Sequence, residues 1–137
     1  MKSTIISCPK CGTKNRIPVF KQHLQPKCGR CQNKIDLHGH IKPIVLTDHD
    51  FSQFILEAPI PVMIDFYSPT CGPCRMLAPL IDAIANRYYD RLLVAKIDTS
   101  INSRSAMQYR IKGVPTLIFF VTASRSTNQS VPFQKIN

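Results

Sequence analysis

Six cysteines arranged as three Cys-x-x-Cys pairs constrain this 137-residue chain more than any other feature. The pairs are Cys8/Cys11, Cys28/Cys31 and Cys71/Cys74. The segment before and around the first pair has no apolar h-region, so we expect no secretory signal peptide there and a cytoplasmic location. In a chain of that compartment, such pairs indicate metal binding or redox catalysis rather than a disulfide framework.

The first two pairs have the spacing of a structural zinc site. Sixteen residues separate Cys11 from Cys28, which lies within the usual range for two zinc knuckles. Two residues between cysteines let a tight turn direct both sulfurs to one metal, and two such turns complete a closed tetrahedron of soft ligands. The alternatives, two disulfides or four free thiols, suit a cytoplasmic chain poorly. We expect Cys8, Cys11, Cys28 and Cys31 to bind one structural zinc ion, and we expect no organic cofactor.

The third pair lies where an apolar strand is expected to give way to a helix. Residues 61–67 are almost continuously apolar, as in a strand buried on both faces. The residues after Cys71 carry apolar side chains at helical spacing, at Leu77, Leu80, Ile81 and Ile84. A cysteine at a helix N-terminus meets the positive end of the helix dipole, which favours its thiolate form. A thiolate at Cys71 could attack a disulfide, and Cys74 could resolve the mixed disulfide. A third metal knuckle is the weaker alternative, because no partner pair is left for it.

Strand and helix patterns alternate after residue 43, which predicts an α/β sheet. The expected strands are residues 44–46, 61–67, 92–97 and 116–121, and the expected helices are residues 47–57, 71–89 and 102–110, with Pro79 kinking the second helix. Residues 129–135 alternate like a strand, and Pro132 would confine it to a sheet edge. A polar linker over residues 38–43 divides the chain into domains at 1–40 and 41–137. The first domain has too few large apolar residues to fold without a staple.

Positive charge is concentrated in the N-terminal part. The chain has a net charge of +10, and residues 1–40 hold eight Lys or Arg against one acid, a net +7. Such a patch can attract acidic partners or nucleic acid, and the plainer alternative is a solvated face that partly offsets an anionic metal site. No series of aromatic residues is interleaved with the cations, so nucleic acid is not expected. A membrane span is not expected either, because no run of eighteen apolar residues exists.

Five short segments occur in the order and spacing of thioredoxins. They are Asp65-Phe66-Tyr67, Cys71-Gly72-Pro73-Cys74, Leu77-Ala78-Pro79, Ala95-Lys96-Ile97-Asp98 and Gly113-Val114-Pro115-Thr116. With the four-cysteine module in front, residues 5–120 resemble the zinc-ribbon-bearing thioredoxins of bacteria. The resemblance implies a thioredoxin-like mixed sheet flanked by helices. It also implies a protein disulfide reductase that is recharged by an NADPH-dependent flavoprotein, thioredoxin reductase.

The resemblance further implies roles for residues around the redox pair, Cys71 and Cys74. Asp65 corresponds to a buried aspartate beneath the pair, which would relay a proton to or from Cys74. Lys96 corresponds to the lysine beside that aspartate.

A second set of residues would bind the substrate. Pro115 corresponds to a cis-proline that faces the cysteines, and Val114 before it would present backbone groups to an extended substrate. Thr70, Gly72 and Pro73 complete the expected substrate surface.

The sequence departs from the thioredoxin pattern in two places. Thr70 stands where thioredoxins carry tryptophan, which removes apolar surface beside the nucleophile. After Phe120 the family continues with a glycine-containing hairpin, a strand and an amphipathic helix, whereas residues 122–137 form a divergent polar tail. We therefore expect the usual last helix to be missing, one sheet face to be uncovered and the domain to be marginally stable. Dimerisation through that face is one expected consequence.

Two other functions stay open on the sequence alone. One is a binding module, in which the basic zinc ribbon binds nucleic acid or an acidic protein and the thioredoxin-like part is a scaffold. The other is a redox sensor, in which oxidation of the four knuckle thiolates releases zinc.

Overall fold

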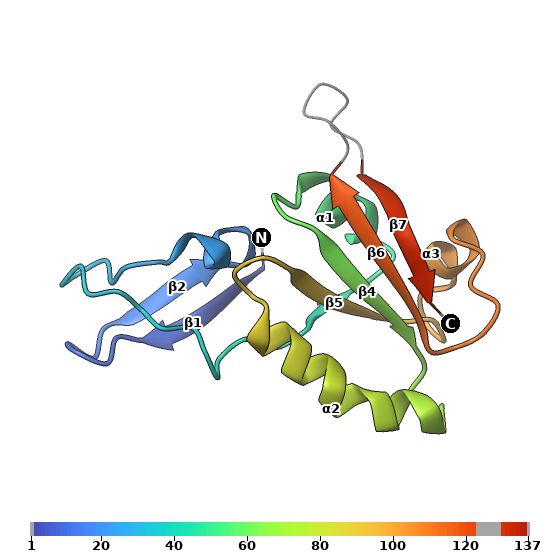
Figure 1. Ribbon diagram of the computed structural model, residues 1–137, viewed down its shortest axis with the longest axis horizontal. Coiled ribbons are helices and arrows are strands. Elements are labelled where there is room, and N and C mark those ends of the chain that lie inside the picture. The colour runs from blue at the N-terminus through green and yellow to red at the C-terminus, as the bar shows by residue number, and fades with distance from the viewer. Residues whose placement is uncertain (1, 123–129, 137) are drawn as a thin grey trace.

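The computed structural model describes residues 2–122 and 130–136, and it places a small hairpin beside a larger sheet (Figure 1). Strands β1 (Ser3–Ser7) and β2 (Lys14–Pro18) form the antiparallel hairpin, and the 3-10 helix η1 (Val19–Leu24) follows it. The larger sheet has the order β3-β5-β4-β6-β7. Its strands are β3 (Ile44–Leu46), β4 (Val62–Tyr67), β5 (Leu93–Asp98), β6 (Thr116–Thr122) and β7 (Ser130–Ile136).

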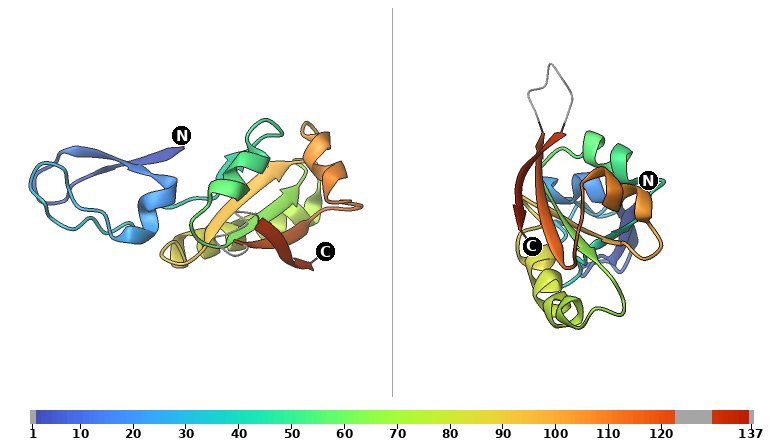
Figure 2. Two further views of the ribbon diagram at one scale, coloured as in Figure 1. Left: turned by 90° about the horizontal axis from the view of Figure 1, so that it is seen from above. Right: turned by 90° about the vertical axis from the view of Figure 1, so that its right-hand side faces the viewer.

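The larger sheet is mixed, as expected. Strands β3, β4 and β5 are parallel, whereas β6 runs antiparallel to β4 and β7 antiparallel to β6. Helices α1 (Phe51–Glu57) and α3 (Ser103–Gln108) cover one face, and α2 (Gly72–Arg87) covers the other (Figure 2). Strand β7 lies at the sheet edge, which agrees with the restriction expected from Pro132. Within the described residues no helix follows β7, and the tail residues 123–129 and 137 lie outside that part.

The face beneath α1 and α3 holds the larger apolar core. Phe51, Phe54 and Ile55 of α1 are buried, as their helical spacing predicts. The ring of Phe51 lies 5.8 Å from that of Phe66 on β4. Burying side chains of this size contributes roughly 1.5–3 kcal/mol each to folding. This core holds the carboxyl ends of β4 and β5 in place, where the third cysteine pair begins.

Helix α2 packs on the opposite face through a narrower stripe than expected. Ile81 and Ala85 are buried, and they share an apolar cluster with Met63 of β4 and Val94 of β5. Leu80, which the sequence placed in this stripe, is 56% exposed. It precedes Ile81 by one residue, about 100° around the helix, and therefore points away from the sheet. The helix continues through Pro79 to its end at Arg87.

The N-terminal part packs against the larger sheet at several points. Val19 is buried in the α1-side core, and the ring of Phe20 lies 5.0 Å from that of Phe54. Lys2 forms a 3.3 Å ion pair with Asp50. At the other end of this junction, the backbone N–H of Gly39 donates to the Asn86 side chain of α2. The division at residue 40 stays a prediction, because these contacts join both sides of it.

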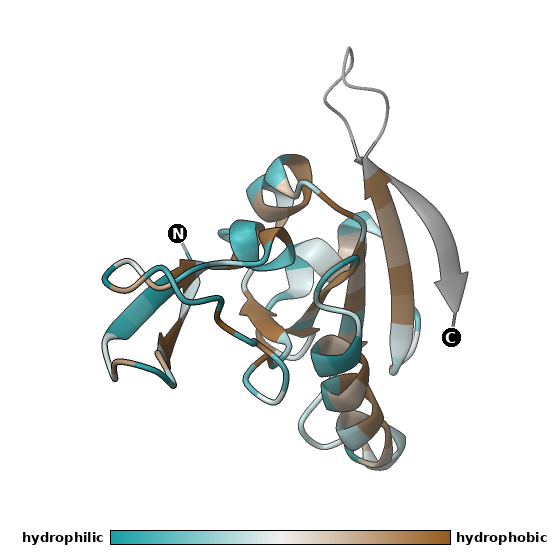
Figure 3. Cartoon of the chain, turned by 60° about the vertical axis from the view of Figure 1, so that its left-hand side comes forward, coloured by the Kyte–Doolittle hydropathy of each residue, from teal (hydrophilic) through white to brown (hydrophobic). Residues whose placement is uncertain are grey.

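Hydrophobic residues concentrate on the strands of the larger sheet (Figure 3). Strand β6 is hydrophobic along most of its length in this view. Leu117 and Phe119 of β6 pack against the α2-side cluster and stay only partly buried. Within the described ranges, no helix has both the length and the apolar character that crossing a membrane requires.

Candidate functional site

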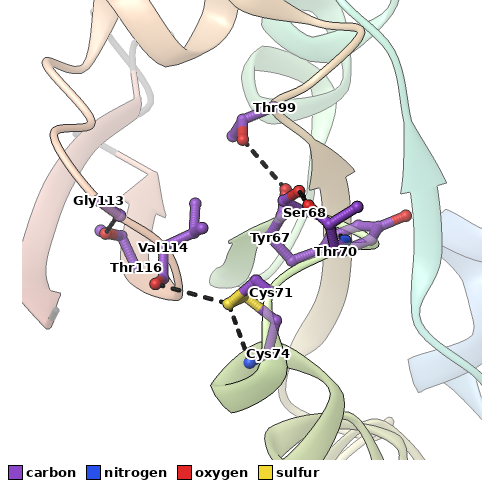
Figure 4. The surroundings of a disulfide bond; sticks show 9 residues. All are labelled: Tyr67, Ser68, Thr70, Cys71, Cys74, Thr99, Gly113, Val114 and Thr116. Atoms are coloured by element: carbon purple, nitrogen blue, oxygen red, sulfur yellow. Dashed lines mark hydrogen bonds between the residues drawn. A yellow bond between two sulfur atoms is a disulfide. The ribbon is translucent and has the colours of Figure 1, made fainter.

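The third cysteine pair lies at the N-terminus of α2, directly after β4. Cys71 is the N-cap residue of the helix, and its Sγ accepts a hydrogen bond from the backbone N–H of Cys74 at 3.2 Å. The two residues form a disulfide with their Cα atoms 5.2 Å apart (Figure 4). Cys71 is partly exposed, whereas Cys74 is only 4% exposed. The helix N-terminus therefore stabilises a thiolate on the sulfur that solvent can reach.

A loop from the β6 side approaches the same sulfur. The carbonyl oxygen of Val114 lies 3.7 Å from Cys71 Sγ, and the Val114–Pro115 peptide bond is cis (Figure 4). The Thr116 hydroxyl is buried and donates to the carbonyl of Gly113 at 2.6 Å, which fastens the loop to the start of β6. An extended peptide could lie along this backbone beside the disulfide.

The residues between β4 and α2 complete the surroundings of the disulfide. Thr70, Gly72 and Pro73 are all exposed. The Thr70 and Ser68 hydroxyl oxygens lie 3.2 Å apart, so Thr70 offers a small polar surface beside Cys71. The structure thus brings the five residues that were expected to bind substrate to one edge of the sheet. They are Thr70, Gly72, Pro73, Val114 and Pro115.

Asp65 lies on β4 beneath the disulfide and is almost completely buried. The residue is 4% exposed, and its Oδ1 atom has no hydrogen-bond partner in the described part of the chain. Asp65 and Cys74 line the same small cavity of about 110 Å³. A cavity of that size has room for a water molecule beside the Asp65 carboxyl group, and such a water would provide a route for a proton between the two side chains.

Lys96 on β5 lies directly across the strand pair from Asp65. Burial raises the pKa of Asp65 to about 6, and the positive charge of Lys96 offsets this only in part. The Lys96 Nζ lies 5.5 Å from the ring centre of Tyr67 and also borders the cavity. Asp65 can therefore take up and release a proton near neutral pH.

The buried carboxyl group predicts a specific pH dependence of stability. The unfolded chain loses the Asp65 proton near its ordinary pKa of 3.8, whereas the folded chain keeps it up to about pH 6. The wild type therefore loses stability as the pH rises through that interval. Asp65→Asn, which stays neutral, should gain an advantage in unfolding free energy that reaches about 3 kcal/mol by pH 8.

Urea unfolding of the oxidised proteins at pH 5 and pH 8 checks this dependence. Any effect of pH on the zinc site is common to both proteins and cancels in the difference. Asp90→Asn, at an exposed position, is the matched control and should give a difference that does not change with pH. A constant difference for Asp65→Asn would mean that Asp65 is not buried in its neutral form.

The four N-terminal cysteines meet at one point. Their sulfur atoms all lie within 4.8 Å of one another, and the Cys8–Cys31 and Cys11–Cys28 separations are both 3.6 Å. Four sulfurs around a zinc ion, each about 2.3 Å from the metal, lie roughly 3.8 Å apart. The cluster therefore fits a tetrahedral zinc ion, and its four ligands leave no open position for substrate.

The backbone around the knuckles also suits thiolate ligands. The Arg30 N–H lies 3.4 Å from Cys28 Sγ and donates to it. The Asn15 side chain accepts from the Gly29 N–H at 2.9 Å and joins the second knuckle to β2. Gly12, after the first knuckle, adopts a φ of +78°, which glycine reaches without strain.

Two features were not predicted from the sequence, one at the redox site and one at the start of α3. The α2 side of the small cavity is formed by Cys74 and Arg75 and, further along the helix, by Ala78, Ile81 and Asp82. Their spacing of four, seven and eight residues from Cys74 is the signal that could have placed them on one helix face. The second feature is Asp48, which accepts the backbone N–H groups of Arg104 and Ser105 and so caps α3 from a distant loop.

A redox disulfide at a helix N-terminus, above a buried acid and beside an X-Pro loop, defines a dithiol–disulfide oxidoreductase. The thioredoxin family model matches residues 42–135, and a model described as Thioredoxin 2, N-terminal, a zinc ribbon, matches residues 7–33. The chain belongs to the thioredoxin family, and it acts as a protein disulfide oxidoreductase through its Cys71–Cys74 pair.

Individual relatives agree with this assignment. Thioredoxin C-3 of Corynebacterium nephridii is 39% identical over 116 residues, which cover 83% of this chain and 76% of that protein. Thioredoxin 1 of Synechococcus elongatus is 48% identical over 58% of this chain and 75% of its own length. Among solved structures, Trichomonas vaginalis thioredoxin superposes with a TM-score of 0.60 at 26% identity, over 69% of this chain and 83% of that one.

Proposed function

We propose that Cys71 is the attacking nucleophile in the reduction of protein disulfides. The observation that carries this proposal is the asymmetry of the pair, because Cys71 is partly exposed at the helix N-terminus and Cys74 is buried behind it. The Cys71 thiolate attacks one sulfur of the substrate disulfide, so a Cys71–substrate bond forms as the substrate S–S bond breaks. The released substrate thiolate takes a proton from solvent.

Cys74 completes the transfer of two electrons. The Asp65 carboxylate, which the positive charge of Lys96 favours, accepts the Cys74 proton through the cavity that both residues line and becomes neutral. The Cys74 thiolate then attacks Cys71 Sγ, which forms the internal disulfide and releases the second substrate sulfur as a thiolate. That thiolate takes up a proton from solvent, so the substrate is reduced to a dithiol and the protein is left in its oxidised form.

The proposed substrate surface is the edge formed by Thr70, Gly72, Pro73, Val114 and Pro115. An extended substrate would align with the Val114 backbone and present its sulfur to Cys71, as in strand addition. Thr70 contributes a hydroxyl group where a larger side chain would add apolar contact.

We also propose an electron donor, a structural metal ion and an assembly state for this protein. Electrons would come from NADPH through a flavoprotein thioredoxin reductase. The cysteines Cys8, Cys11, Cys28 and Cys31 would hold a structural zinc ion, which suits a reducing cytoplasm where thiolates persist. The partly buried Leu117 and Phe119 support the expectation of a dimer through the sheet face beside α2.

Trapping of the mixed disulfide tests the two cysteine roles. Cys74→Ser should accumulate a covalent adduct with a disulfide substrate, because Cys71 can still attack and nothing resolves the product. Mass spectrometry of reduced Cys74→Ser mixed with oxidised insulin should locate the adduct on Cys71. The double variant Cys71→Ser/Cys74→Ser is the control and should form none. An adduct on a knuckle cysteine instead would reject the assignment of Cys71.

A further inference from the structure

The two chain segments that meet at the disulfide carry positive charges and no carboxylates. Residues 66–81, from the end of β4 into α2, contain Arg75 and no Asp or Glu. Residues 103–121, from α3 through β6, contain Arg104, Arg110 and Lys112, again without Asp or Glu. All four cationic residues are exposed.

Two of these cations lie close in sequence to the groups that contact Cys71. Arg75 directly follows Cys74 on α2, and Lys112 precedes Val114 by two residues. Val114 in turn approaches Cys71 Sγ to 3.7 Å, from the side opposite Ser68 and Thr70 (Figure 4). Within the described residues, neither Arg75 nor Lys112 has a carboxylate within ion-pair distance.

The nearest carboxylates that could offset these charges are engaged or lie elsewhere. Asp98 ends β5, on the opposite side of β4 from Val114, and its Oδ1 accepts two hydrogen bonds from Ser100. Asp48 binds the N-terminal backbone of α3 and so offsets Arg104. Asp65 and Asp82 line the same small cavity as Arg75 and offset part of its charge, although neither forms an ion pair with it. The β6 side of the disulfide therefore keeps its positive charge.

Apolar contacts at this edge are few, which increases the weight of charge in recognition. Thr70, Gly72 and Pro73 offer small surfaces, and the large exposed side chain nearby is Met76, at 84% exposure. We propose that the cations Arg75 and Lys112 make this protein select disulfides flanked by Asp or Glu residues. This inference rests on the proposed function, because it names the class of substrate for the same site.

The expected selectivity follows from electrostatic steering. Charges around a reactive edge mainly raise the rate of productive encounter with oppositely charged partners, and salt screens the effect. We expect kcat/KM at low ionic strength to be about tenfold higher for an acidic than for a basic disulfide peptide, with a neutral peptide between them.

Three matched peptides test the proposal on the full zinc-loaded chain. Each carries one intramolecular disulfide in the same backbone, flanked by Glu, Ser or Lys, and dithiothreitol, which is uncharged, supplies the electrons. Raising the salt concentration from about 0.01 M to about 1 M shortens the screening length from roughly 30 Å to 3 Å, so the preference should collapse toward equal rates.

Charge variants assign the preference to the named residues. Arg75→Gln/Lys112→Gln should reduce the acidic-to-basic ratio to about twofold or less, and Lys112→Gln alone should account for part of the loss. Lys14→Gln/Lys34→Gln removes the same net charge from the N-terminal part, on exposed residues outside the segments that border the disulfide, and should keep the ratio.

The outcomes separate this inference from the proposed function. Failure to reduce the Ser-flanked peptide would reject the oxidoreductase mechanism itself. Reduction of all three peptides at equal rates would overturn only the selectivity. Equal loss of selectivity in both double variants would overturn it too, because net charge and not the edge of the site would then be responsible.

Discussion

Cys71→Ser should reduce insulin with dithiothreitol at least about a thousandfold more slowly than the wild type. A serine hydroxyl cannot form the mixed disulfide, and Cys74 is 4% exposed, so it cannot take over the attack on a protein substrate. The precipitation rate of the insulin B chain gives the measurement. The uncatalysed reaction with dithiothreitol sets the floor.

The loss must be separated from misfolding. Cys71→Ser should bind as much zinc as the wild type and unfold at a similar temperature under reducing conditions, because the Cys71 side chain is only partly buried. Activity above about a tenth of the wild type would mean that other sulfurs carry the reaction. The knuckle cysteines would then be the candidates, and a redox-sensing role for the N-terminal part would gain support.

Local patterns in the sequence were enough to predict most elements of the larger sheet. The run from Val62 to Tyr67 is apolar at nearly every position, and such a run leaves few alternatives to a buried strand. Packing between distant segments was not predictable in this way. Val19 and Phe20 follow the hairpin in sequence, yet they pack against α1, and no periodicity within either segment indicates that contact.

The same distinction between local pattern and distant packing applies to the residues of the site. The three cysteine pairs were predictable because each depends on a spacing of two residues, and the helix N-terminus follows from the strand before it. The cavity between Asp65 and Cys74 depends on how α2 crosses β4, which is a matter of tertiary packing. The absence of a large apolar side chain at Thr70 was visible in the sequence. The excess of positive charge at Arg75 and Lys112 could be recognised only from the structure, because it depends on where Asp48 and Asp98 lie.

Zinc removal should unfold the N-terminal hairpin and leave the larger sheet folded. Cys8 and Cys28 are 2% and 0% exposed, and they belong with Ile6, Ile17 and Leu37 to the N-terminal end of the apolar cluster that continues under α2. Two metal ligands are thus part of that cluster itself, and the other apolar residues of the N-terminal part are too few to keep the hairpin folded without the metal. Metal binding contributes on the order of 10 kcal/mol to such modules, more than a core of this size supplies.

Hydrogen exchange on the protein before and after chelation measures this effect region by region. Amides of β1 and β2 should lose their protection in the metal-free protein, and Cys28→Ser should reproduce the loss. Amides of β4 and β5 should stay protected, because α1 and the other face of the sheet form a second core, to which the N-terminal part contributes Val19 and Phe20. The matched variant Cys74→Ser should retain one zinc ion per chain and a protected hairpin. Protection of β1 and β2 without metal would show that the contacts of Lys2, Phe20 and Gly39 with the larger sheet suffice to fold the hairpin.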